Sequence, residues 1–214
     1  MQYVNLESWI RRDHFQAFKS WGFPHLNICA NVDLTPFYSY IKHYDISFNL
    51  AIVYVITWVA NDIREFRYRI QDSRVAEYEI VHPAITIMLH DDLFGFCPLE
   101  FVEDFTEFCT RATKQIDVMR NQPSLSNDPA RDNLFYMTSI PWVSFTNILH
   151  PLDLANLDSV PRFAWGKFFK EGDVIKMPLY TQGHHALMDG VHIGRFFEKI
   201  QDRLNQPSRA LGEV

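Results

Sequence analysis

The chain of 214 residues carries a net charge of −6, and 47% of its residues are hydrophobic and 15% aromatic. This length allows one large domain with a substantial buried core, and the apolar content excludes intrinsic disorder. The acidic balance, without a cluster of Lys and Arg among aromatic residues, gives nucleic-acid binding no support.

The cysteines and the N-terminus point to a compartment. Cys29, Cys97 and Cys109 are isolated, and an odd number without a CxxC pair favours reduced thiols in a cytoplasm. The N-terminal residues contain no apolar signal core. The longest apolar run, residues 46–60, is shorter than the about 20 residues that cross a bilayer. We therefore expect a cytoplasmic protein without a membrane-spanning segment.

In the first third of the chain, helix signals alternate with a strand signal. Residues 8–21 are predicted to form a helix with Ser8 as its N-cap. Residues 25–34 alternate between apolar and polar positions, which is typical of a strand. Pro36 follows a threonine, as expected at a helix start, and the apolar run predicts a helix over residues 45–62.

The rest of the chain predicts a hairpin, further strands and two amphipathic helices. Pro178, within one of these strands, suggests a sheet edge or a bulge. The predictions, in chain order, are a hairpin over residues 65–81, a strand over 84–90, a loop over 90–98, a helix over 101–120, a polar loop over 121–133, a strand over 134–145 interrupted by Pro141, a strand over 173–182 and a helix over 190–204. Because helices and strands alternate irregularly, we expect a single domain, residues 1–214, of the α/β class: a two-layer sandwich in which helices cover a mixed β-sheet.

The segment TQGHHALMDGVHIG, residues 181–194, concentrates reactive side chains and allows three interpretations. His185, Asp189 and His192 could bind a metal, although the chain has no HExxH motif or Cys/His pair, which disfavours a metal site. The segment could be an ordinary strand-to-helix corner, with Asp189 capping the helix and Gly190 in the turn. Alternatively, a histidine, with a pKa near ~6.5, could act as a general base.

HHALMDG, residues 184–190, matches the HHxxxDG signature, so the chain resembles the chloramphenicol acetyltransferases and the related dihydrolipoamide acyltransferases. Further matching segments follow the same order along nearly the whole chain: SWIRRDHF at 8–15, EFRYRI at 65–70, SIPWVSF at 139–145, FFKEGDVIKMPL at 168–179 and GVHIGRFFEKIQ at 190–201. The resemblance implies an acetyl-CoA-dependent O-acetyltransferase, with chloramphenicol as the first acceptor to expect. It also implies a homotrimer whose active sites lie between subunits.

The resemblance assigns catalytic roles to four residues. His185 would be the general base that deprotonates the acceptor hydroxyl for direct attack on the thioester. Asp189 would pair with Arg11, and this pair would brace the site. Thr138 would donate to the oxyanion, where the resistance enzymes have a serine. Ser139 is the neighbouring candidate, but on a strand its side chain would face the opposite way.

Binding roles follow from the same resemblance. Trp142, Lys167 and Phe168 match positions near the coenzyme, and Ala164 replaces a threonine of the family. The acceptor pocket differs most, because Ala17 and Phe18 stand where the resistance enzymes have a Phe-Tyr pair. The candidates for acceptor contact are Phe18, Phe94, Phe96, Leu125 and Phe135.

Two alternatives to a chloramphenicol acetyltransferase remain. The altered pocket would suit a related acyltransferase that acts on another hydroxyl compound. The substitutions at Thr138 and Ala164 would also suit a relative that binds an apolar ligand without turnover, although such a protein would have no need for His185. A lipoyl-linked acyltransferase core is disfavoured, since the chain has no lipoyl domain or linker.

Overall fold

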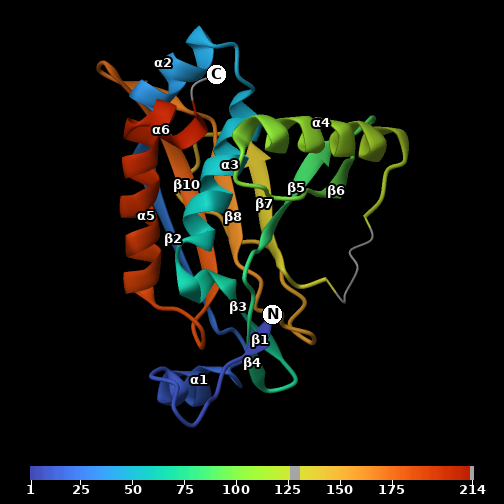
Figure 1. Cartoon of the computed structure of the whole chain (residues 1–214), viewed down its shortest axis with the longest axis vertical. Coiled ribbons are helices and arrows are strands. Elements are labelled where there is room, and N and C mark those ends of the chain that lie inside the picture. The colour runs from blue at the N-terminus through green and yellow to red at the C-terminus, as the bar shows by residue number, and fades with distance from the viewer. Residues whose placement is uncertain (126–130, 213–214) are drawn as a thin grey trace.

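The computed structural model describes residues 1–125 and 131–212, and in this part of the chain helices cover a large mixed β-sheet (Figure 1). A smaller sheet lies at one end of the molecule together with the first helix. The architecture is the predicted α/β sandwich. The smaller sheet is an addition to it, because the predicted hairpin pairs with the N-terminus and not with the main sheet.

The main sheet has the strand order β2-β10-β8-β7-β5-β6, and β9 pairs with β10 beside this path. It is mixed because β7 runs parallel to both β5 and β8, while its other pairs are antiparallel. The strands are β2 (His25–Asp33), β5 (His82–Met88), β6 (Phe94–Pro98), β7 (Leu134–Ile140), β8 (Arg162–Gly166), β9 (Phe169–Glu171) and β10 (Val174–His184).

The helical layer is organised around α3 (Phe48–Asn61), which is apolar along nearly its whole length. Ser47 caps it by accepting a hydrogen bond from the backbone N–H of Leu50. A helix without a polar face must be buried on all sides, and α3 packs against β5 and its neighbouring helices. These neighbours are α2 (Thr35–His43), α4 (Phe105–Asn121), α5 (Gly190–Asn205) and α6 (Pro207–Leu211).

The smaller sheet consists of β1 (Gln2–Tyr3), β4 (Arg74–Glu77) and β3 (Tyr68–Gln71), and a 3-10 turn, Arg64–Arg67, leads into it. It lies near α1 (Arg12–Phe18) in Figure 1. Between them is a second hydrophobic cluster that includes Phe15, Tyr68, Ala186 and Leu187, all fully or nearly fully buried. Because Ala186 and Leu187 belong to the HHALMDG segment, this cluster anchors that segment against the N-terminal part of the chain.

Several local predictions are wrong. Ser8 is not a cap, because α1 begins only at Arg12. Residues 94–98, predicted as loop, form the edge strand β6, since its apolar residues pair with β5 after a turn in which Asp91 and Asp92 adopt positive φ. Pro178 lies in β10, an inner strand, at the point where β10 changes its partner from β9 to β8. Strands β1, β8 and β9 were not predicted.

Candidate active site

The HHALMDG segment forms the corner between β10 and α5. His184 ends the strand, and its carbonyl accepts hydrogen bonds from the backbone N–H groups of Leu187 (2.8 Å) and Met188 (3.1 Å). The N–H of His185 donates to the carbonyl of Pro24 at 2.7 Å, which ties the corner to the start of β2. His185 is therefore held by its backbone on a tight turn, and its side chain remains one-third exposed.

The surroundings of the His185 ring determine which nitrogen carries the proton. Its Nδ1 lies 3.2 Å from the carbonyl oxygen of Met188 and 3.1 Å from Oδ1 of Asp189. Both neighbours are acceptors only, so Nδ1 must be the N–H donor in the neutral ring. Nε2 then keeps its lone pair and can accept a proton.

Arg11 and Asp189 form the predicted ion pair. Arg11 Nη1 donates to Oδ2 of Asp189 at 2.6 Å and Nη2 donates to Oδ1 at 3.2 Å, a two-pronged contact. The pair is mostly buried, with side-chain exposures of 10% and 26%. These hydrogen bonds hold the pKa of Asp189 below its usual value, so the carboxylate stays ionised. Arg11 Nη2 also lies 3.4 Å from the carbonyl of His185, so it contacts both ends of the corner.

Phe18 lies against the His185 ring. The two ring centroids are 4.1 Å apart and the planes are inclined by 15°, which is a stacked arrangement. Phe18 was predicted to contact the acceptor. Acceptor contact stays a prediction, and its position on α1 gives Phe18 a further role that the sequence does not reveal: it covers one face of the imidazole and restricts its rotation.

The other histidines of the segment have structural partners. Nδ1 of His184 accepts the N–H of Ala186 at 3.2 Å, and burial lowers the pKa of His184 to about 4, so this ring is neutral. Nδ1 of His192 accepts the N–H of Asp189 at 2.8 Å, in the first turn of α5. Over residues 1–125 and 131–212, no group of three or more His, Cys, Asp or Glu side chains could hold a metal.

Thr138 lies on the sheet face opposite the helices. Strand alternation places its neighbour Met137 in the main core, and Thr138 itself points the other way. Its hydroxyl is 2.7 Å from that of Thr86 on β5, and either oxygen could be the donor. A Thr138 hydroxyl that donates to a substrate oxygen needs Thr86 to donate to it, because each hydroxyl has one proton. Thr86 was missed, since its position opposite Thr138 depends on the pairing of β5 with β7.

The strand register separates Thr138 from His185 within one chain. Thr138 is opposite Ala164, and Ala164 is opposite Tyr180. His185 is five residues further along β10 and two strands away from Thr138. At about 3.3 Å per residue and about 4.8 Å between strands, their Cα atoms are roughly 20 Å apart. Side chains of these lengths cannot bridge that distance, so the two residues of one chain do not form one site.

The three coenzyme candidates lie near one another. The N–H of Lys167 donates to the carbonyl of Val143 at 2.9 Å, and Ser144 Oγ donates to the carbonyl of Lys167 at 2.6 Å. These bonds join the segment after Trp142 to the one that carries Lys167 and Phe168. Trp142 is 65% exposed, whereas the Phe168 ring, 37% exposed, packs on aromatic rings of α2 and α3. A cation beside exposed rings suits a ligand with phosphate and apolar parts.

Most acceptor candidates lie along the edge strand. Phe96 is paired with Thr86, so Phe96 and Phe94, whose rings are 5.6 Å apart, share the face that carries Thr138. Leu125 is exposed and follows Ser124, whose carbonyl accepts the N–H of Phe96. The prediction for Phe135 needs correction: its side chain is fully buried on the helix side, because it lies three positions before Thr138 and alternate residues of a strand face opposite ways.

Comparison with known proteins identifies the family. Residues 1–201 match the family described as chloramphenicol acetyltransferase. The chloramphenicol acetyltransferase of Escherichia coli is 31% identical over 202 residues, which are 92% of this chain and 91% of that protein. The chain belongs to the chloramphenicol acetyltransferase family. It is therefore an acyltransferase of the chloramphenicol acetyltransferase type, and membership implies acetyl-CoA as co-substrate.

Solved structures agree with this family. A chloramphenicol acetyltransferase superimposes with a TM-score of 0.82 at 25% identity and covers 95% of this chain and 99% of its own. The dihydrolipoamide acetyltransferase of Azotobacter vinelandii shares the fold, with a TM-score of 0.70 at 13% identity, and covers 93% of this chain and 88% of its own. The cubic core of the pyruvate dehydrogenase multienzyme complex shares the fold as well, with a TM-score of 0.63 at 13% identity, and covers 88% of this chain and 84% of its own.

The helices and the cysteines of the described residues bear on membrane spanning and on the compartment. No helix within the described residues is long and apolar enough to cross a membrane. Cys29, Cys97 and Cys109 are all free thiols, as the sequence suggested. The cytoplasmic location stays a prediction.

Proposed function

We propose that the chain transfers an acetyl group from acetyl-CoA to a hydroxyl of a small molecule, with chloramphenicol as the first acceptor to test. The observation that carries this proposal is the state of His185. Its Nδ1 faces two acceptors, which leaves the Nε2 lone pair free for a proton. The names of the relatives supply the acceptor, and the acidic chain with its apolar edge-strand residues is compatible with a neutral aromatic compound.

In the proposed reaction, His185 Nε2 takes the proton of the acceptor hydroxyl while the hydroxyl oxygen forms a bond to the thioester carbon. Thr138 donates its proton in a hydrogen bond to the carbonyl oxygen, where negative charge develops. When the carbon–sulfur bond breaks, His185 returns its proton to the departing thiolate. Asp189 faces the imidazolium that exists in between, and Arg11 keeps Asp189 ionised and in place.

We further propose that the active form of this enzyme is a homotrimer, as the family resemblance suggests, with each site shared by two subunits. The separation of about 20 Å between His185 and Thr138 supports shared sites, because the two groups must come from different copies to meet. Exposed apolar side chains support an interface: Ile10, Trp142, Leu149 and Leu154 are each more than 60% exposed.

The test measures free thiol released from acetyl-CoA, with and without chloramphenicol, by the native protein and by His185→Ala. We expect chloramphenicol-dependent release that falls roughly 100- to 10,000-fold in the variant, since the general base is lost. His43→Ala, which removes an exposed histidine at the end of α2, is the matched control and should keep native activity.

Two other outcomes would contradict parts of the proposal. A native protein that binds acetyl-CoA but releases no thiol with chloramphenicol acts on a different acceptor, as its Phe18 and Ala17 positions would allow. If a panel of other hydroxyl compounds also gives no thiol release, the proposal of an enzyme gives way to that of a relative that binds an apolar ligand without turnover.

A further inference from the structure

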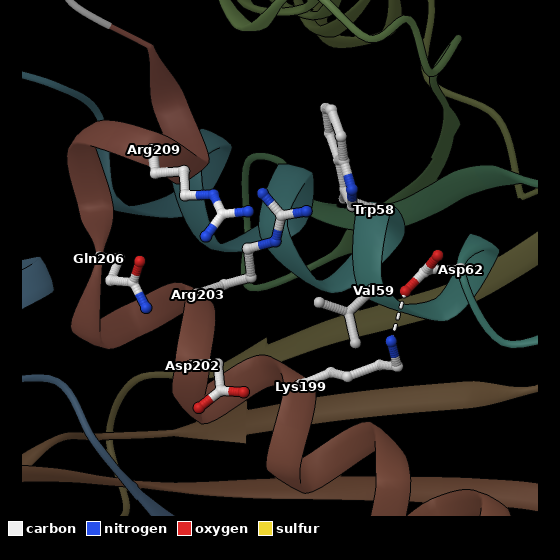
Figure 2. A pocket seen from close by; sticks show the side chains of 8 residues that line it. All are labelled: Trp58, Val59, Asp62, Lys199, Asp202, Arg203, Gln206 and Arg209. Atoms are coloured by element: carbon white, nitrogen blue, oxygen red, sulfur yellow. Dashed lines mark hydrogen bonds and ion pairs between the residues drawn. The ribbon is translucent and has the colours of Figure 1, made fainter.

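A cleft on the outer surface of the helical layer lies apart from the candidate active site. It has a volume of about 250 Å³ and opens between α3, α5 and α6 (Figure 2). Its lining residues are Trp58, Val59, Asp62, Lys199, Asp202, Arg203, Gln206 and Arg209. Arg203 is 14 residues beyond Asp189 along the α5 segment, which corresponds to about 20 Å of helix. A group bound in the cleft is therefore too far from the corner between β10 and α5 to reach the proposed base, and none of the proposed catalytic or coenzyme residues lines the cleft.

The charges in this cleft are unevenly paired. Lys199 Nζ and Asp62 Oδ2 form an ion pair at 2.7 Å, so these two charges satisfy each other. Arg203 and Arg209 have no acidic partner among residues 1–125 and 131–212. The remaining carboxylate, Asp202, points away from both guanidinium groups in Figure 2.

The two unpaired arginines converge. Figure 2 shows the guanidinium groups of Arg203 and Arg209 directed toward one another from α5 and α6. The Arg203 guanidinium is also held 4.9 Å over the ring of Trp58, which orders its long side chain. Two like charges that approach each other repel, and an anion between them removes that cost. This arrangement stands out because the chain as a whole is acidic, with a net charge of −6.

We propose that this cleft binds a phosphate group, held between Arg203 and Arg209. Each guanidinium offers a planar pair of N–H donors that fits a tetrahedral oxyanion in two-pronged fashion. Two guanidinium groups carry two positive charges, so a phosphate with its double negative charge suits them better than a carboxylate with a single charge. A bare phosphate does not fill a volume of about 250 Å³, so the cleft has room for a small phosphate monoester as well as for free phosphate.

Calorimetric titration at constant ionic strength tests the proposal, with inorganic phosphate in one arm and glycerol 2-phosphate in the other. We expect saturable binding with a Kd on the order of 1 mM, as suits a half-open site with two charge-assisted contacts. The arm with the lower Kd identifies the source of the phosphate group, free or esterified. Chloride at the same ionic strength should produce no saturable heat.

Variants assign the binding to these residues. Arg203→Gln and Arg209→Gln should each weaken phosphate binding at least five-fold, whereas Arg195→Gln, which removes an exposed cation of α5 that does not line the cleft, should leave it unchanged within two-fold. Each variant must unfold at a temperature close to that of the native protein. Unchanged binding in both Arg203→Gln and Arg209→Gln would overturn the proposal, because phosphate would then occupy another place, such as the coenzyme region near Lys167. Absence of saturable binding in the native protein would overturn it too.

Discussion

At the scale of single residues, the candidate base depends on a chain of three contacts. Arg11 holds Asp189, Asp189 faces Nδ1 of His185, and Phe18 stacks on the same ring. The carboxylate keeps its charge because the guanidinium lowers its pKa. Removal of the arginine would leave that charge partly buried and unpaired, which is costly.

Replacement of Arg11 by methionine should therefore lower both stability and activity. Since the pair is not completely buried, we expect a loss of about 2 kcal/mol in the free energy of unfolding. Acetyl transfer should fall as well, because Asp189 would no longer be fixed beside the base. Urea unfolding and thiol release measure the two effects.

Arg12→Met is the control for this prediction. Arg12 is the next residue, it is exposed, and it takes part in no ion pair over the described residues. Its replacement should change the free energy of unfolding by less than about 0.5 kcal/mol. Equal losses in the two variants would mean that the N-terminal segment, and not the ion pair, determines the effect.

At the scale of elements, the corner between β10 and α5 requires a residue without a side chain at Gly183. A Cβ atom built there would lie 2.0 Å from Sδ of Met188 and 2.7 Å from its Cγ. Met188 is fully buried in the main core, so its side chain cannot move aside freely. The close approach of strand and turn thus depends on this glycine.

Gly183→Ala should destabilise the protein by about 2 kcal/mol, which is typical of overpacking a filled core. It should also reduce acetyl transfer, since the corner that holds His185 must shift. Thermal unfolding and thiol release are the measurements.

Gly194→Ala is the control, and it should change the free energy of unfolding in the opposite direction. Gly194 lies inside α5, and nothing approaches within 4 Å of a Cβ built there. Alanine should stabilise the helix by about 0.5–1 kcal/mol through its helix propensity. If Gly183→Ala were equally tolerated, the packing argument for the corner would be wrong.

Elements with a strong local pattern could be predicted from the sequence, and the others could not. The apolar helix α3 and the amphipathic helix α5 were found because their periodicity is intrinsic to the segment. Strand β6 was missed because its five residues include Gly95 and end at Pro98, which is typical of a loop. Only the pairing with β5 makes this segment a strand. The role of Thr86 was hidden for the same reason, since it depends on the order of strands in the sheet.

At the scale of the whole molecule, the fold class followed from the alternation of elements, but the assembly did not. The family resemblance alone suggested a trimer, because exposed apolar residues do not specify how many copies meet. The register adds a constraint that the sequence could not supply: the proposed base and the proposed oxyanion donor of one chain are roughly 20 Å apart. The proposed shared sites would reconcile this distance with catalysis.

Shared sites predict complementation between two defective proteins. His185→Ala and Thr138→Ala should each have little activity alone, because each removes one group from every site. If the two are unfolded, mixed in equal amounts and refolded together, a site is complete when an intact His185 meets an intact Thr138 from the neighbouring copy. Random assembly would restore about one quarter of the sites.

The control for complementation mixes the two variants after separate refolding, without exchange of subunits. The activity of the mixture should then equal the sum of the activities that the two variants have alone. Should co-refolded mixtures also stay at that sum, the base and the donor would have to act within one chain, and the distance argument would fail.

The distance between His185 and Thr138 has a consequence for how this enzyme could be inactivated. In a protein whose catalytic groups lie in one chain, the activity per chain does not change on dilution as long as the chain stays folded. Here, on the proposed assembly, the catalytic centre obeys mass action: below the concentration at which copies associate, every chain could remain folded while no complete centre exists. Catalytic activity would then depend on the concentration of chains, with a threshold set by their association and separate from the conformational stability of each chain.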